Sequence, residues 1–440
     1  MKSRAIILCL GLGCGMSAFA VDPKPALRVL RDECVGCHKP GKAKGCLLLT
    51  THEKMMKGGD NGASVVPGKA ADSLLYQLVL KDGDPHMPPK KQLPAQAVTA
   101  LKTWIDGGAV WDASVFDEVP LPRPVALQAM PAAYQPVLAL ALSLDEKRMA
   151  VARSNEVLLI DLTKTERPVV GRLLGHVEPI QSLGWSADGT RMVTGGYQRV
   201  IVWDVAAMKP LLEVKEGLLG AITALAVDSS YHAIFIADGE TGGAGFIRKL
   251  DLATGKALTT WKAHDDNVLS LKLSAKADRL LSGGADKLAK LWDTGTGKLV
   301  SFYEGHTNHV LAVAFNKDAT QIATAGADRE VKVWDVASRE QDVSLGDKKV
   351  AFTGAHWTAD GKSLAVVTDK GGGSVYTELK KHDGAQRSDT AKERKLSGVS
   401  ETLSSVVITG DSKWVFAGGF NGKVYVWDAA SGQSKGELTL

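Results

Sequence analysis

Two stretches of equal length decide the fold of most of this chain. Residues 264–293 read HDDNVLSLKLSAKADRLLSGGADKLAKLWD, and residues 306–335 read HTNHVLAVAFNKDATQIATAGADREVKVWD. Each begins with histidine and ends with Trp-Asp, and the two Trp-Asp pairs lie 42 residues apart. Between these ends, apolar and polar residues alternate in short runs, which is the pattern of β-strands. The two stretches therefore predict two copies of one multi-stranded unit.

Similar endings recur throughout residues 136–440. Trp-Asp closes a repeat at residues 203–204, 292–293, 334–335 and 427–428, and weaker cognates are Ile160-Asp161, Leu250-Asp251 and Tyr376-Thr377. Neighbouring markers lie 42 to 51 residues apart. A period near 40 residues with Gly-His and Trp-Asp punctuation resembles the WD-repeat β-propeller. Seven markers predict an all-β propeller of seven blades.

The WD-repeat resemblance implies structural roles for the repeated polar residues. In WD blades a His, a Ser or Thr, a turn Asp and the Trp indole form one buried hydrogen-bonded chain. The implied sets are His264, Ser282, Asp286 and Trp292 in blade 4, and His306, Thr324, Asp328 and Trp334 in blade 5. Blade 2 keeps His176, Thr194 and Trp203, with Tyr197 at the expected aspartate position. We expect these residues to hold the blades together and to have no catalytic role.

A different signature stands near the N-terminus. Residues 34–38 read CVGCH, the Cys-x-x-Cys-His attachment motif of c-type haem. Cys34 and Cys37 can form thioethers to two vinyl groups on one porphyrin edge, which places His38 under the iron as the proximal ligand. A redox disulfide would need a βαβ pattern, and a four-cysteine zinc site is excluded because Cys46 is the only other cysteine after residue 20. The motif predicts one covalently bound haem c.

The distal iron ligand is expected to be Met87, in the segment HMPPKKQL. Two prolines stiffen the backbone directly after this methionine. A thioether ligand favours ferrous iron and raises the reduction potential, which suits electron transfer. The rival ligands are His52, Met55, Met56 and His86.

Helical patterns frame this motif. Leu27, Leu30 and Cys34 share one helix face, and Pro94 precedes an apolar stripe that ends at Gly107-Gly108. The order of these features resembles a class I cytochrome c, in which a helix, the haem motif, a methionine and a second helix follow one another. With KAKGCLLLTTHEKMMKGGDNG (42–62) and LKTWIDGGAVW (101–111), roughly residues 30–111 resemble the planctomycete-type cytochrome c domain. The resemblance implies a small all-α haem domain, and Cys46 stands where that family usually has glycine, as a small buried hydrophobe or as a free or intermolecular thiol.

Residues 1–20 have the pattern of an export signal. Lys2 and Arg4 precede the uncharged apolar stretch 5–12, and Ala18-Phe19-Ala20 is a small-x-small cleavage site. We expect cleavage between Ala20 and Val21 and a periplasmic or otherwise exported protein. The alternatives are an uncleaved anchor or a lipoprotein modified at Cys14. No later stretch approaches the roughly 20 apolar residues of a membrane span.

The expected organisation is a signal peptide (1–20), a cytochrome c domain (21–111), a proline-rich linker (112–135) and the propeller (136–440). The final segment GQSKGELTL supplies an outer strand of blade 7, so a blade shared between the two chain ends is not required. Alternatively, residues 124–130 add an edge strand there. Residues 380–397 are expected to form an exposed loop of blade 6.

Charge and composition indicate which classes of partner the protein binds. The net charge of +4 is too weak to indicate nucleic-acid binding, and 45% hydrophobic with 23% charged residues is ordinary for a globular protein. Residues 21–111 contain 13 basic and nine acidic residues, which favours an acidic redox partner.

Three functions follow from these patterns. The first is a monohaem electron-transfer protein, not itself an enzyme, whose propeller docks a protein or peptide. The second is a haem-based redox or ligand sensor or scaffold. The third is an oxidoreductase with a second cofactor in the propeller. The cytochrome–propeller enzymes that this layout resembles, cytochrome cd-type nitrite reductases and quinohaemoprotein dehydrogenases, have eight-bladed propellers. The histidines that the blade pattern does not use form no recognisable metal or nucleophile site; they are His232, His309, His356 and His382.

Overall fold

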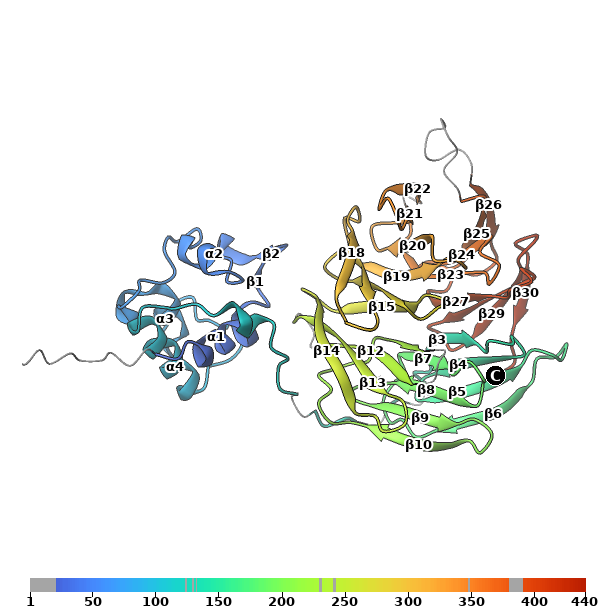
Figure 1. Ribbon diagram of the computed structural model, residues 1–440, viewed down its shortest axis with the longest axis horizontal. Coiled ribbons are helices and arrows are strands. Elements are labelled where there is room, and N and C mark those ends of the chain that lie inside the picture. The colour runs from blue at the N-terminus through green and yellow to red at the C-terminus, as the bar shows by residue number, and fades with distance from the viewer. Residues whose placement is uncertain are drawn as a thin grey trace, which may run out of the picture. The chain divides into compact units, whose positions relative to one another are not determined.

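The structure is a computed structural model that describes residues 21–122, 125–128, 130–131, 133–228, 232–239, 243–346, 349–379 and 391–440. Contacts divide the chain into a helical unit that ends at Glu118 and a β-sheet unit that begins at Val119 (Figure 1). The expected signal peptide with its cleavage site after Ala20, and His382, lie outside the described residues.

The helical unit contains four α-helices among its described residues: α1 (Lys24–Val29), α2 (His52–Lys57), α3 (Leu74–Val79) and α4 (Ala95–Asp106). A π-helical turn (Leu30–Cys34) continues α1, and short 3-10 turns cover Lys44–Cys46, Ala70–Asp72 and Ala113–Phe116. β1 (His38–Lys39) and β2 (Lys42–Ala43) form a two-stranded hairpin directly after the cysteine motif. The predicted first and last helices are confirmed, and α1 packs against α4. Leu101, Trp104 and Ile105 of α4 are buried at this contact.

Residues 113–118, which we expected in the spacer, pack with the helical unit. Phe116 stacks on Trp111 with 4.8 Å between the ring centroids. Arg28 donates two hydrogen bonds to the Glu118 carboxylate, at 2.8 and 3.0 Å. An aromatic pair and a bidentate ion pair thus extend this unit beyond the last helix. The division of the chain by contacts accordingly falls after Glu118, within the segment expected as linker.

Seven four-stranded antiparallel sheets form the second unit, which confirms the predicted seven-bladed propeller (Figure 1). The strands are, in blade 1, β3 (Val137–Leu142), β4 (Arg148–Arg153), β5 (Glu156–Asp161) and β6 (Val169–Leu174); in blade 2, β7 (Ser182–Trp185), β8 (Arg191–Gly195), β9 (Val200–Asp204) and β10 (Lys209–Val214); in blade 3, β11 (Ala224–Val227), β12 (Ala233–Gly239), β13 (Gly245–Asp251) and β14 (Ala257–His264); in blade 4, β15 (Val268–Leu273), β16 (Arg279–Gly284), β17 (Ala289–Asp293) and β18 (Leu299–Tyr303); in blade 5, β19 (Val310–Phe315), β20 (Gln321–Gly326), β21 (Glu330–Asp335) and β22 (Gln341–Gly346); in blade 6, β23 (Phe352–Trp357), β24 (Ser363–Thr368), β25 (Gly373–Thr377) and β26 (Lys392–Leu396); and in blade 7, β27 (Leu403–Ile408), β28 (Trp414–Gly419), β29 (Val424–Asp428) and β30 (Ser434–Glu437).

The repeat markers have one structural position. Each of the seven, including Ile160-Asp161, Leu250-Asp251 and Tyr376-Thr377, ends the third strand of its blade. The apolar residues between markers form the buried faces along which neighbouring sheets pack. Spacing and strand pattern therefore identified even the blades that lack Trp-Asp.

The ring closes without a shared sheet, because blades 1 and 7 are each built from consecutive strands. The described residues among 124–130 form no strand. Instead, strand β27 contacts β3, and Leu140 donates its backbone N–H to Ser405 Oγ at 3.1 Å. The Glu146 carboxylate accepts the backbone N–H of Gly410 with both oxygens, at 2.9 and 2.8 Å. Side chains thus replace the interlocked strand at this junction.

Part of the expected loop 380–397 is a strand. Residues 392–396 form β26, and Glu393 lies opposite Tyr376 of β25. The hydroxyls of Ser374 and Tyr376 donate to the Glu393 carboxylate at 2.7 and 3.1 Å. Only one residue of this strand is buried, so its sequence, KERKL, lacks the apolar alternation that identifies a strand. Residues 380–390 lie outside the described part of the chain.

Candidate functional site

An apolar cleft in the helical unit brings the predicted haem residues together. Cys34, Cys37, His38 and Met87 all line it. The cleft has a volume of about 1190 Å³ with its open mouth included. The rest of its wall is mainly aliphatic and includes Leu47, Leu49, Leu74, Leu75, Leu78, Val79, Pro85, Pro88 and Pro89. This donor set fits haem c, because it combines two thiols at one edge with an imidazole and a thioether. The apolar wall fits the porphyrin surface.

The His38 imidazole is held by the backbone around it. Its Nδ1 lies 3.3 Å from the carbonyl oxygen of Leu47, and its own carbonyl accepts the N–H of Leu49 at 2.9 Å. With the proton on Nδ1 donated to Leu47, the lone pair of Nε2 is available to a metal. The turn after α1 brings this ring beside the two cysteines, since the N–H of His38 bonds the Val35 carbonyl at 3.1 Å.

The thiol of Cys34 is protonated at neutral pH. Burial raises its pKa to about 12, and the neighbouring carboxylate of Glu33 adds to this shift. That carboxylate also forms an ion pair with Lys91, which belongs to the same segment as Met87. The pair therefore joins the cysteine motif to the segment that carries the distal ligand candidate. The sequence reasoning missed this contact.

Two backbone contacts hold the Met87 segment against α3. The N–H of Met87 donates to the Leu78 carbonyl at 2.8 Å, and Gln92 Nε2 donates to the Val79 carbonyl at 3.0 Å. These contacts place the Met87 side chain on the wall of the cleft. Met87 therefore shares the cleft with Cys34, Cys37 and His38.

The four rival ligands lie elsewhere within the described residues. Met55 is fully buried in the helical core, and Met56 packs against that core. The ring of His52 lies near Trp111, with 5.9 Å between centroids. His86 has both ring nitrogens engaged, with Nε2 3.0 Å from Gln92 Oε1 and Nδ1 3.1 Å from a backbone carbonyl. None of the four lines the cleft.

Cys46 is exposed, so the expectation of a small buried hydrophobe is wrong. The residue lies on a surface turn with φ of 53°, in the left-handed region that favours glycine. This is the conformation that the glycine expected from the family resemblance adopts without strain. A hydrogen bond to Asp60 raises the pKa of the thiol.

The propeller brings its predicted polar sets together. In blade 4, His264 Nε2 lies 2.7 Å from Ser282 Oγ, Nδ1 lies 2.8 Å from Asp286 Oδ1, and the Trp292 indole N–H donates to Ser282 at 2.8 Å. The blade 5 set has the same arrangement, with distances of 2.7 to 3.0 Å among His306, Thr324, Asp328 and Trp334. Burial lowers the pKa of both histidines, although the hydrogen bond from each to its aspartate opposes this shift.

Blade 2 completes its set with a different acid. Glu178 Oε1 lies 2.7 Å from His176 Nδ1, and the other side of the ring lies 2.8 Å from Thr194. Tyr197 does not take this position. Although burial opposes ionisation, the hydrogen bond to His176 holds the pKa of Glu178 below its usual range. The acid two residues after the histidine was the sequence signal for this contact.

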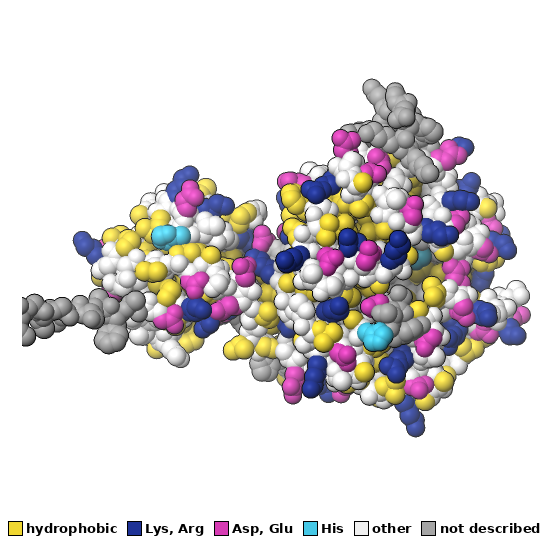
Figure 2. All heavy atoms as spheres, in the orientation of Figure 1, with side chains coloured by type: hydrophobic (Ala, Val, Ile, Leu, Met, Phe, Trp, Pro, Cys, Tyr) yellow, Lys and Arg dark blue, Asp and Glu magenta, His cyan; other side chains and the backbone are white. Residues whose placement is uncertain are grey.

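The described histidines outside the cleft and the blade sets belong to no cluster suited to a metal ion. Among the described residues, no cluster of three or more His, Cys, Asp or Glu side chains is arranged to bind a metal ion. The same part of the chain has no helix with the length and apolar character that crossing a membrane requires. On the face shown in Figure 2, acidic and basic side chains are mixed over the propeller.

Comparison with known proteins supports both parts of the architecture. Residues 34–91 match the family model described as planctomycete cytochrome C. Residues 167–204, 255–293, 297–335 and 392–428 match the WD domain, G-beta repeat.

Curated relatives match only over part of their repeats. They include cell division cycle 20.1, cofactor of APC complex, from Arabidopsis thaliana, 27% identical over 33% of this chain and 31% of that protein. WD repeat-containing protein 3 homolog from Dictyostelium discoideum is 31% identical over 27% of this chain and 12% of its own length. WD repeat-containing protein 3 from Homo sapiens is 24% identical over 30% of this chain and 13% of its length. The chain thus spans less than a third of each relative.

Proposed function

We propose that this chain, in which a planctomycete-type cytochrome c domain precedes a WD-repeat β-propeller, is an exported monohaem electron carrier that docks a partner through its propeller. One observation carries the proposal: Cys34, Cys37, His38 and Met87, named from the sequence, line a single apolar cleft. In this proposal the chain transfers electrons and catalyses no reaction of its own.

The residues of the cleft have distinct tasks. Cys34 and Cys37 would anchor the haem edge through thioethers, and His38 would bind the iron through Nε2 while Leu47 orients its ring. Met87 would supply its thioether as the second protein ligand of the iron. When bound, the haem supplies a reversible one-electron centre. The aliphatic wall limits water, and the thioether favours the reduced state.

The propeller is proposed as the docking platform. WD propellers suggest protein–protein interactions, and the buried His-centred sets in blades 2, 4 and 5 make the scaffold rigid. The mixed charge on the face of the propeller shown in Figure 2 argues for a protein or peptide in preference to nucleic acid. Export rests on the pattern of residues 1–20, which fits the compartment where c-type haem is attached.

The proposal is tested on protein produced in a host that matures exported c-type cytochromes. A reversible one-electron couple, together with no carbon monoxide complex of the reduced protein, supports a closed electron carrier. Ready binding of carbon monoxide by the wild type would instead favour the ligand-sensor function, because an open iron position is what such a sensor needs. Absence of a reversible couple would reject the carrier function.

A further inference from the structure

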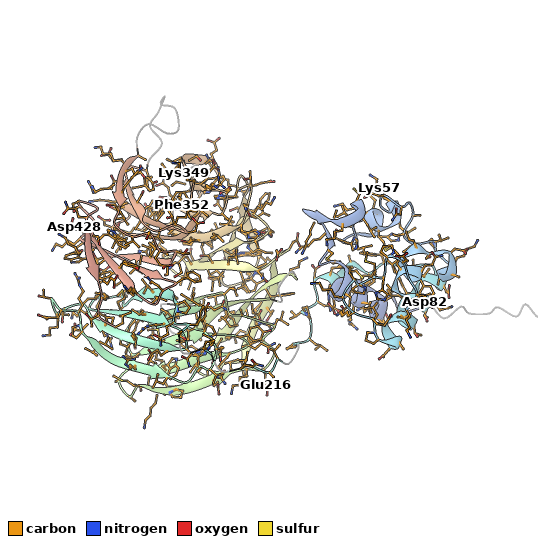
Figure 3. All side chains as sticks on the ribbon, turned by 180° about the vertical axis from the view of Figure 1, so that it is seen from behind. Lys57, Asp82, Glu216, Lys349, Phe352 and Asp428 are labelled. Atoms are coloured by element: carbon orange, nitrogen blue, oxygen red, sulfur yellow. The ribbon has the colours of Figure 1, made fainter. Side chains whose placement is uncertain are left out.

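The innermost strands of the propeller form a wall with an unusual charge content. The seven strands β3, β7, β11, β15, β19, β23 and β27 contact one another in sequence, and β27 contacts β3 to close the ring. Strand β23, which begins at Phe352, is seen from behind in Figure 3. Two side chains in these strands are ionisable, Lys272 on β15 and His356 on β23. None of the seven strands carries an aspartate or a glutamate.

Lys272 and His356 lie at the same level of the ring. Each is the last but one residue of its strand, and each pairs with the second strand of its blade, with Leu281 and Ala365 respectively. The equivalent residues of the other blades are small or aliphatic: Ala141, Gly184, Ala226, Ala314 and Val407. Small side chains at this level leave space around the two polar ones.

His356 presents a hydrogen-bond donor at this level. Its Nδ1 accepts the backbone N–H of Ile408 at 3.4 Å. The proton of the neutral imidazole is therefore on Nε2, which can donate. Burial and the charge of Lys272 lower the pKa of His356 to about 3, so the ring stays neutral near pH 7.

Lys272 supplies a positive charge that the protein does not neutralise. Within the described residues its ammonium has no hydrogen-bond or ion-pair partner. Its side chain is accessible to water, yet the protein packed around it lowers its pKa. A partly dehydrated ammonium without a protein counter-charge attracts an anion.

We propose that the axial channel binds a small oxyanion, a carboxylate or a phosphate, between Lys272 Nζ and the Nε2–H of His356. The two donors stand on blades 4 and 6 at one level of the ring, and the alanine and glycine residues at that level provide the room. This site is independent of the cytochrome cleft, and it gives the propeller a small-molecule ligand in addition to a docking partner.

The test measures the thermal unfolding of the propeller in the full mature protein. Inorganic phosphate and acetate are titrated separately at constant ionic strength, with chloride as the balancing anion. Binding should raise the melting temperature by roughly 2–4 °C for each tenfold rise in free anion above the dissociation constant. Lys272→Leu should abolish this rise, and Lys272→Arg should retain it. Lys276→Gln, which removes an exposed lysine of the same blade, is the matched control and should behave as the wild type.

Comparing the two anions identifies the ligand class. A response to phosphate alone assigns a phosphate site, and a response to acetate alone assigns a carboxylate site. Calorimetric titration of the folded wild type and Lys272→Leu provides a readout that does not depend on unfolding. The proposal is wrong if neither anion binds the wild type, or if both bind Lys272→Leu equally well.

Discussion

The Nδ1 atom of His38 lies 3.3 Å from the carbonyl oxygen of Leu47, so a backbone group sets both the tautomer and the direction of the imidazole. This contact leaves the lone pair of Nε2 available for the iron ligation proposed above and fixes the direction of the ring. The hairpin that begins at His38 fixes this geometry, because Leu47 follows the second strand and the short turn after it. The orientation of the proposed proximal ligand is thus a product of local chain geometry directly after the cysteine motif.

Replacing one anchoring thiol should weaken haem retention. Cys37→Ala removes one of two proposed thioethers, so covalent haem content should fall severalfold while the propeller stays folded. The exposed Cys46→Ala is the matched control and should load normally. Haem-stained gels and the pyridine haemochrome spectrum measure the difference. Normal loading of Cys37→Ala would refute the attachment site.

Replacing the distal thioether should change both potential and ligand access. Met87→Ala should lower the reduction potential by on the order of 0.1 V or more, within the range of roughly 0.8 V that axial ligands control. The reduced variant should also bind carbon monoxide. His86→Gln is the control, because that ring lies outside the cleft. If His86→Gln changed the potential and Met87→Ala did not, the ligand assignment would be reversed.

Glu178 should stabilise blade 2. Glu178→Ala leaves the buried Nδ1 of His176 without its partner, which should cost about 1–3 kcal/mol of unfolding free energy. Tyr197→Phe, the position favoured by the sequence pattern, should change stability by less than about 0.5 kcal/mol. Chemical denaturation of the two variants distinguishes them. Equal effects would show that Glu178 has no special role in the blade.

Whether a side-chain contact can be predicted from the sequence depends on whether its members keep a constant spacing from one repeat to the next. The sets around His264 and His306 were predictable because paired strands of constant length keep their members at constant spacing. Glu178 was not, because a short local turn brings it to the place that a residue 22 positions after the histidine occupies in blades 4 and 5. Met87 was preferred over its rivals on the sequence alone because of the prolines beside it, and the fold adds that, of these candidates, Met87 lines the cleft.

Acid should destabilise the propeller before its carboxylates titrate. Burial lowers the pKa of His264 and His306 in the folded state, so the unfolded chain binds more protons below about pH 6.5. Stability should therefore fall as pH drops from 7.5 to 5.5, by at most about 1.4 kcal/mol per pH unit for each histidine. His264→Gln should reduce the slope in pH-dependent denaturation. A flat wild-type profile over this interval would contradict the account.

The most direct test of the central claim is the intact mass and absorption spectrum of the mature protein from a host that attaches c-type haem. The account predicts the mass of residues 21–440 plus one haem, with the low-spin reduced spectrum of iron bound by His38 and Met87. A protein without covalent haem, or one with a second chromophore, would contradict it.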